Sequence, residues 1–271
     1  MVRSVFVDAG GFPILSEGSH RVDHSTPLAD RWGGWYVTGK SGEQAHLGNM
    51  VIRGKSVARP FENLAGRNVE NLRERLTIGN YLAAGSDIVA LMVFEHQTLI
   101  HNLMTKASYA ERQALLYESE FNRALGRPLE HRLESTTRRI QHAGDALLEG
   151  LLFVDETPLT DPIKGNTKYA ENFTARGSKD ERGRSLREFD LTKRMFRYPC
   201  SYLIETRTFD ALPPLIKSHV ATRLRAILRG DDQDKKYAHL SPADRKAIYE
   251  ILTAVKPELW KALPVNVEKP K

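Results

Sequence analysis

The sequence predicts an α+β protein in which a small β-rich N-terminal part packs against a larger, mostly α-helical part. Two observations lead to this fold class. Apolar residues near the N-terminus fall in short β-branched and aromatic runs, whereas from Ser86 onward they recur with a period of about 3.6 residues. The 271 residues are 41% hydrophobic and 27% charged, which is typical of a globular protein. We expect four segments: an incomplete β-rich part (1–60), a connection (61–85), a helical domain (86–263) and a loose tail (264–271).

The N-terminal part is expected to contain several short strands. Residues 2–7 read Val-Arg-Ser-Val-Phe-Val and are followed by the turn signal Asp-Ala-Gly-Gly. Further apolar runs lie between glycines and prolines, which punctuate strands. They predict strands at 12–15, 31–39 and 46–52.

The helical part begins with Ser86-Asp87, a good N-cap pair, and its first helix is expected to end near Lys106. Ser108 and Glu111 have the spacing of a capping box, which predicts a second helix ending near Gly126. Later caps and apolar stripes predict helices at 135–153, 167–176 and 187–197. Two further helices are predicted to begin at Pro213-Pro214 and at Ser241-Pro242.

Composition excludes several classes of protein. The single cysteine, Cys200, rules out a disulfide within the chain, a multi-cysteine zinc site and a Cys-x-x-Cys-His haem attachment within these residues. We expect it to be a buried, slowly reacting thiol. The net charge of +6 is spread among mixed signs, as in 176–197, which argues against nucleic-acid binding. No apolar run reaches 18 residues, so no membrane span is expected.

A first candidate site lies at Glu95-His96 on the first helix. Helical geometry directs His96 into the apolar stripe, whereas His101 lies roughly 140° away around the helix. A buried histidine needs a hydrogen-bond partner or a ligand. His96 is therefore either a satisfied core residue, or a metal ligand or proton-transfer group acting with Glu95.

A second candidate site is the aromatic block Trp32, Trp35 and Tyr36, which lies among glycines. These rings either fill the core of a sheet or form a wall for a flat ligand such as haem. His46 and Met50 follow closely and are both possible axial ligands of haem iron.

Several motifs together resemble an uncharacterised family of large exported bacterial proteins, of planctomycete and acidobacterial type, that carry a cytochrome c domain. The resemblance covers most of residues 2–260. It rests on the blocks Val2–Val5, Pro13–Leu15, Arg31–Gly39, His46–Asn49, Ser86–Leu91, Glu95–Gln97, His101–Leu103, Arg197–Ile204 and Phe209–Pro213.

This resemblance implies a redox, electron-transfer or haem-sensing role for the parent protein. In the family, a haem-attachment motif precedes the segment that matches Val2, so the chain resembles the C-terminal portion. Haem c would then be held by the missing N-terminal segment, and a redox protein would be the partner. The family often has Met where this chain has Leu47, which would leave His46 or Met50 as substitutes. The resemblance implies an exported, periplasmic protein. No signal peptide is visible, so a chain complete as given would be cytoplasmic.

Two other interpretations remain open at this level. One is a metal-dependent enzyme with a site around Glu95, His96 and Arg197. The other is a non-catalytic interaction domain.

Overall fold

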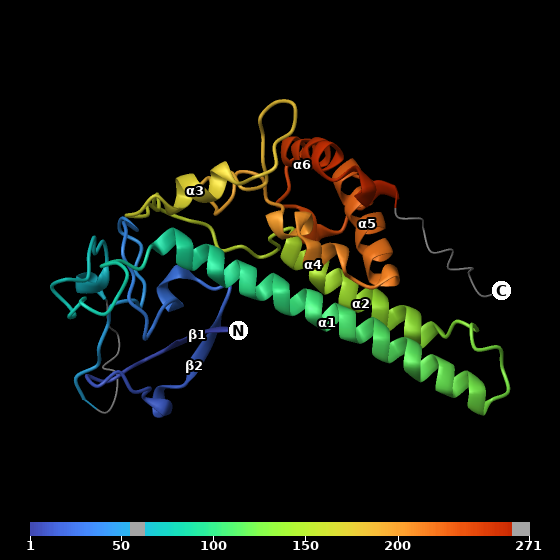
Figure 1. Ribbon diagram of the computed structural model, residues 1–271, viewed down its shortest axis with the longest axis horizontal. Coiled ribbons are helices and arrows are strands. Elements are labelled where there is room, and N and C mark those ends of the chain that lie inside the picture. Colours follow the sequence, from blue (N-terminus) through green and yellow to red (C-terminus); the bar gives the residue numbers. More distant parts are fainter. Residues whose placement is uncertain (55–62, 262–271) are drawn as a thin grey trace. The chain divides into compact units, whose positions relative to one another are not determined.

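The computed structural model describes residues 1–54 and 63–261. Within these residues the fold is mostly helical, with a small antiparallel sheet near the N-terminus, which confirms the predicted α+β class (Figure 1). The chain forms two compact units. Unit 1 comprises Met1–Leu99, Asp155–Gly177 and Arg187–Arg197, and unit 2 comprises the segments between and after these. The predicted loose tail, 264–271, lies outside the described residues.

The sheet of unit 1 pairs β1 (Val2–Val5) with β2 (Ser19–Val22) in antiparallel register, with Val2 opposite Val22. Both valines are buried. β2 is not predictable from the sequence pattern, because the Ser-His-Arg-Val run has little apolar character. On the other side of β1, the Gly33 carbonyl accepts a hydrogen bond from the Val5 N–H at 3.0 Å.

The predicted strands at 31–39 and 46–52 were wrong. Trp32 and Asn49 have positive φ angles of 67° and 65°, which an extended strand does not accommodate. The aromatic block therefore forms turns, and only isolated bridges remain, such as the one between Asp8 and Ile52. The predicted strand at 12–15 is likewise reduced to a single bridge between Val7 and Pro13.

The first helix, α1, runs without interruption from Ile88 to Ala124, so the prediction of two helices separated near residue 107 was wrong. The Glu111 carboxylate does not fold back to cap its own helix at Ser108. It accepts hydrogen bonds from the N–H groups of Leu215 and Ile216, at 3.3 and 2.7 Å, in the first turn of α5 (Pro214–Arg229). A local capping signal was thus overridden by a contact with a distant helix end.

Unit 2 is built around the later part of α1 together with α2 (Glu134–Leu151), α5 and α6 (Pro242–Val255). α5 packs against both α2 and α6 (Figure 1). Gly150 lets α2 approach α1 closely, since a Cβ there would lie 2.6 Å from a Leu103 methyl group. The predicted start of α6 is confirmed by a capping box between Ser241 and Asp244.

The shorter helical predictions had mixed outcomes. The expected helix at 167–176 is present as α3 (Tyr169–Ala175), and a further short helix, α4, spans Arg207–Asp210. The expected helix at 187–197 is absent: Phe189 and Phe196 form an antiparallel bridge across a turn instead.

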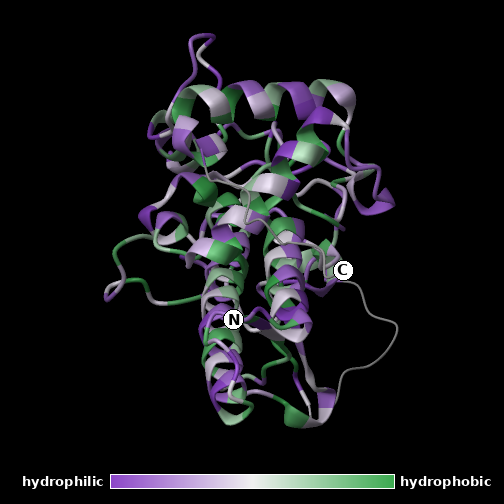
Figure 2. Cartoon of the chain, turned by 90° about the vertical axis from the view of Figure 1, so that its right-hand side faces the viewer, coloured by the Kyte–Doolittle hydropathy of each residue, from purple (hydrophilic) through white to green (hydrophobic). Residues whose placement is uncertain are grey.

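The helices in Figure 2 carry both hydrophilic and hydrophobic residues along their length. In the described part of the chain, no helix combines the length and the apolar character needed to cross a membrane.

Cys200 is fully buried in unit 2, and burial raises the pKa of its thiol, with a further contribution from the Glu205 carboxylate. The thiolate is the reactive form of cysteine, so both access and ionisation disfavour reaction in the folded state. This geometry favours the predicted slow thiol over a reactive one.

A thiol reagent should therefore label Cys200 in the native protein at least about 100-fold more slowly than in the urea-unfolded protein, because labelling requires the fold to open. The rate of release of a chromogenic thiol-exchange product measures both states. Native labelling within a few-fold of the unfolded rate would show that the thiol is accessible.

Candidate functional site

The first turns of α1 carry Glu95 and His96 into the interior of unit 1. Asp87 fixes the start of the helix, since its Oδ1 atom accepts a hydrogen bond from the Val89 N–H at 2.9 Å. His96 is 0% exposed and Glu95 is 1% exposed, and Met92, one turn earlier, is also buried. The prediction that His96 points into the apolar stripe is therefore confirmed.

The partner of His96 is His24, from the loop that follows β2. Their Nδ1 atoms lie 3.1 Å apart, and the two rings are tilted with centroids 5.2 Å apart. Burial lowers the pKa of His96 well below its ordinary value, and the charge of His24 lowers it further. Because one Nδ1 must donate to the other, this arrangement suits two neutral imidazoles with complementary tautomers.

Beside this pair lies an ion pair between Arg31 and Glu95. The Arg31 Nη1 atom is 3.1 Å from Glu95 Oε2, and both side chains are almost completely buried. The same guanidinium donates from Nε to the Thr26 carbonyl at 2.8 Å and from Nη2 to the His24 carbonyl at 3.0 Å. These contacts satisfy the guanidinium in three directions, as a buried charge requires.

Burial raises the pKa of Glu95 to about 7, although the Arg31 charge and the Trp32 indole act in the opposite direction. Neither Glu95 Oε1 nor Trp32 Nε1 has a partner at hydrogen-bond geometry in the described structure. Oε2 is therefore the only carboxyl oxygen with a hydrogen bond of standard geometry, although the Trp32 indole N–H is close enough to lower the pKa. The neutral form of the group is accessible near neutral pH.

A second carboxyl group, the half-buried Glu156, is influenced by the charge of the same arginine. Burial raises its pKa to about 7, opposed by a hydrogen bond from the Met195 N–H at 2.8 Å and by the charges of Arg194 and Arg31. We call Arg31, Glu95, Glu156, His24 and His96 the buried polar cluster. All five belong to unit 1.

The residues expected near a haem behave differently. Trp32 is buried and packs edge-on against His46, with ring centroids 5.3 Å apart. Burial lowers the pKa of His46 to about 4, and Arg67 contributes to that shift. The Nδ1 atom of His46 accepts a hydrogen bond from the Gly48 N–H at 3.1 Å, which places the ring proton on Nε2. Iron ligation through Nε2 would break this arrangement, so His46 as folded here does not fit an axial ligand.

The remaining candidates are dispersed. Trp35 is half-buried; its indole N–H donates to the Arg3 carbonyl at 2.9 Å and its ring lies against Phe94. Met50 is half-buried. Arg197 is exposed and forms an ion pair with Glu188 at 3.1 Å. Arg31, rather than Arg197, is the arginine that pairs with Glu95.

The chemistry available to the buried polar cluster is proton exchange. Within residues 1–54 and 63–261, no three His, Cys, Asp or Glu side chains are grouped so as to hold a metal ion. His24, Arg31, Glu95 and His96 are each at least 96% buried, so a substrate molecule could not reach them without local opening. A proton can be gained or lost there at pH values near neutrality.

No family model, curated protein or solved structure matches this chain.

Replacing His96 by Ala should lower the free energy of unfolding by roughly 1–3 kcal/mol, through the cavity and the loss of a partner for His24. His101→Ala is the matched control on the same helix; it should cost well under 1 kcal/mol because that side chain is partly exposed. Urea titration of both variants measures the difference. Equal costs for the two substitutions would contradict the assignment of His96 to the core.

The pKa of Glu95 predicts a specific pH dependence. Between its ordinary pKa of 4.5 and about 7, the folded state retains a proton that the unfolded state releases. Protonation of Glu95 therefore stabilises the folded state, and this contribution is fully present below about pH 4.5. It amounts to roughly 3 kcal/mol at most and is lost as the pH rises through about 7. His46 acts in the opposite sense, since its contribution is lost as the pH falls from 6.5 through about 4.

The contribution of Glu95 is isolated by comparing wild type with Glu95→Gln, which leaves His46 in place. The stability of wild type relative to the variant should fall by about 1–3 kcal/mol between pH 5 and pH 8. Glu171→Gln, at an exposed glutamate of α3, should show no such trend. A wild-type advantage over Glu95→Gln that stays constant or grows with pH would refute the raised pKa.

Proposed function

We propose that the chain is the C-terminal portion of a c-type-haem-associated redox protein. In this proposal the haem is carried by another segment, and the buried polar cluster binds protons in response to charge changes at that cofactor. The motif set supplies the cofactor class and the exported, periplasmic setting. The structural observation that supports a redox role is the pair of carboxyl groups with pKa values of about 7, the buried Glu95 and the half-buried Glu156.

The physical reason is charge compensation. Reduction of a cofactor adds a negative charge, and in a medium of low dielectric constant this charge favours proton uptake by nearby groups. A carboxyl group with an ordinary pKa would remain ionised at neutral pH. A carboxyl group with a pKa of about 7 takes up a proton at little cost, while Arg31 keeps a fixed positive charge beside it.

The site geometry is compatible with haem binding outside this chain. His46 uses its Nδ1 lone pair for the Gly48 N–H, and the chain has a single cysteine. These residues would then shape the surroundings of the cofactor rather than bind its iron. The redox partner in this proposal is a separate protein or the haem-bearing segment itself.

The metal-dependent enzyme is the weaker alternative. It requires Glu95, His96 and Arg197 to converge on an accessible centre, but Arg197 pairs with Glu188 while the other two are sealed in the core. A non-catalytic interaction domain needs an accessible binding surface. In unit 1, a lysine-lined cleft on the surface offers one candidate.

The proposal predicts the content of the gene immediately upstream of the Met1 codon. The reading frame should continue upstream and encode Cys-x-x-Cys-His within a short distance, preceded by an export signal. Sequencing of the genomic region tests this directly. A stop codon close upstream of Met1, with no such motif before it, would refute the proposal.

Absorption spectra of the purified chain supplemented with free haem provide a companion test. If another segment carries the haem, no Soret band that shifts on reduction should develop beyond that of free haem. A band that shifts on reduction in wild type and is lost in His46→Ala would place the iron on this chain and overturn that part of the proposal.

A further inference from the structure

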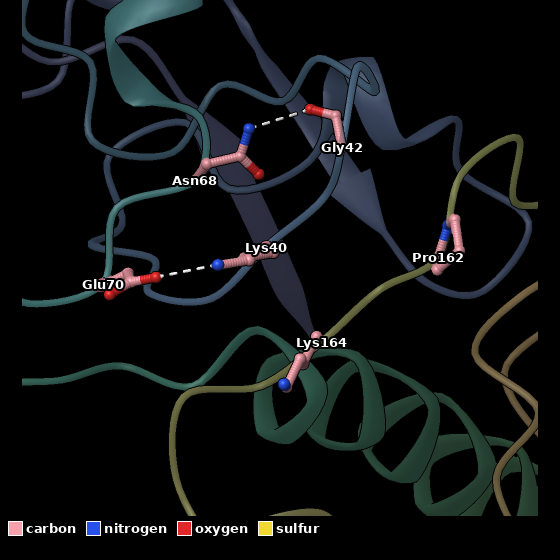
Figure 3. Close-up of a pocket in the computed structure, with 6 residues that line it drawn as sticks. All are labelled: Lys40, Gly42, Asn68, Glu70, Pro162 and Lys164. Carbon is pink, nitrogen blue, oxygen red and sulfur yellow. Dashed lines mark hydrogen bonds and ion pairs between the residues drawn. The ribbon is translucent and has the colours of Figure 1, made fainter.

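A cleft on unit 1, separate from the buried polar cluster, is lined by lysine side chains. It lies where the segment around Lys40 meets the segment around Lys164 (Figure 3). The two lysines form an antiparallel bridge. The Lys40 N–H donates to the Lys164 carbonyl at 2.7 Å, and the reverse hydrogen bond measures 2.9 Å. Residues directly opposite each other in such a pair project their side chains to the same face.

The floor of the cleft is firmly held. The Asp87 Oδ2 atom accepts hydrogen bonds from the N–H and hydroxyl of Thr167, at 3.0 and 2.6 Å, and so anchors this loop to the start of α1. Gly39 has a φ of 129°, and a Cβ there would lie 2.6 Å from the Lys164 carbonyl oxygen. A Cβ at Gly165 would lie 2.6 Å from the Asp87 carboxylate. Glycine at position 39 thus lets the two segments approach each other, and glycine at position 165 lets the loop approach the start of α1.

The charges of the cleft are unbalanced. Its lining includes three lysines, Lys40, Lys164 and Lys168, and one carboxylate, Glu70. The Asp87 carboxylate beneath the loop is not part of the lining, and it is engaged by the Thr167 hydroxyl and by backbone N–H groups. Lys40 pairs with Glu70 at 3.1 Å, as Figure 3 shows, and both side chains are more than half exposed. Within the described part of the chain, Lys164 and Lys168 form no ion pair. Like charges placed opposite each other across a bridge destabilise it unless an anion compensates them.

The neutral polar side chains nearby are already engaged in holding the loops. The Asn68 amide spans Ser41 and Gly42, accepting from the Ser41 N–H at 2.8 Å and donating to the Gly42 carbonyl at 3.0 Å. Asn166 accepts from the Thr38 hydroxyl at 2.9 Å and donates to the Glu70 carbonyl. The lysine ammonium groups are therefore the donors that remain for a ligand, and they suit oxyanions rather than neutral molecules.

We propose that this cleft binds a small oxyanion carrying at least two negative charges, of the phosphate or phosphate-ester class. Its two adjoining hollows have volumes of about 440 and 580 Å³, the size range of small-molecule sites. Lys164 and Lys168 supply the two uncompensated charges. Lys40, shared with Glu70, lies opposite Lys164 at the edge of the site.

Calorimetric titration with pyrophosphate, at constant ionic strength and without divalent metals, tests the proposal. Wild type should bind in a saturable manner. The Lys164→Gln/Lys168→Gln double variant should bind at least about tenfold more weakly, because two charge-assisted contacts are lost. Lys193→Gln removes an exposed lysine elsewhere in unit 1 and should bind like wild type.

Glu70→Gln should change the affinity for pyrophosphate in the opposite direction. It removes the competing carboxylate and releases Lys40, so it should bind pyrophosphate several-fold more tightly, a result that a folding defect would not produce. A parallel titration with succinate distinguishes phosphate chemistry from dicarboxylate chemistry, and stronger binding of succinate would overturn the ligand class. The proposed site would be refuted if wild type showed no saturable binding of pyrophosphate. It would also be refuted if Lys193→Gln weakened binding as much as the double variant, or if Glu70→Gln did not bind more tightly than wild type.

Discussion

The buried contact between Arg31 and Glu95 is the constraint on which the fold of unit 1 depends. Residues 1–54 contain only two four-residue strands, so regular hydrogen bonding orders little of this segment. Arg31 connects the loop after β2 to α1, since it binds the Glu95 carboxylate and the carbonyl groups of His24 and Thr26. Removing one member of such a pair leaves a buried charge without compensation, which is strongly destabilising. The His24–His96 contact joins the same loop to the next residue of α1.

Burial of Arg31 and Glu95 also limits the chemistry that is available to them. The sealed Glu95 carboxyl group, with a pKa of about 7, can exchange protons, but it cannot meet a substrate. Ligands can instead reach the lysine cleft, because its charged groups face solvent. Unit 1 thus separates a proton-binding interior from a surface suited to anions, and neither function requires the other.

The sequence predicted the parts of this structure that are governed by local periodicity. The apolar stripe of α1 placed His96 in the core, and Ser241-Pro242 marked the start of α6. Contacts between distant residues were not predictable. Arg31 and Glu95 are 64 residues apart, and no spacing or motif links them. Glu111 had a local capping partner in the sequence but binds the start of α5 in the structure. The β propensity of the aromatic block was overridden by the positive φ of Trp32, which only its tertiary contacts can impose.

A double-mutant cycle between Arg31 and Glu95 tests the central claim most directly. Urea unfolding would be measured at pH 8, where Glu95 is mostly ionised, for Arg31→Met, Glu95→Gln and the double variant. If the pair organises unit 1, Arg31→Met should cost about 3–5 kcal/mol, and the double variant should cost clearly less than the sum of the single changes. We expect a coupling free energy of at least about 2 kcal/mol. A coupling near zero, with each substitution costing little, would show that the N-terminal segment is held to α1 by other contacts.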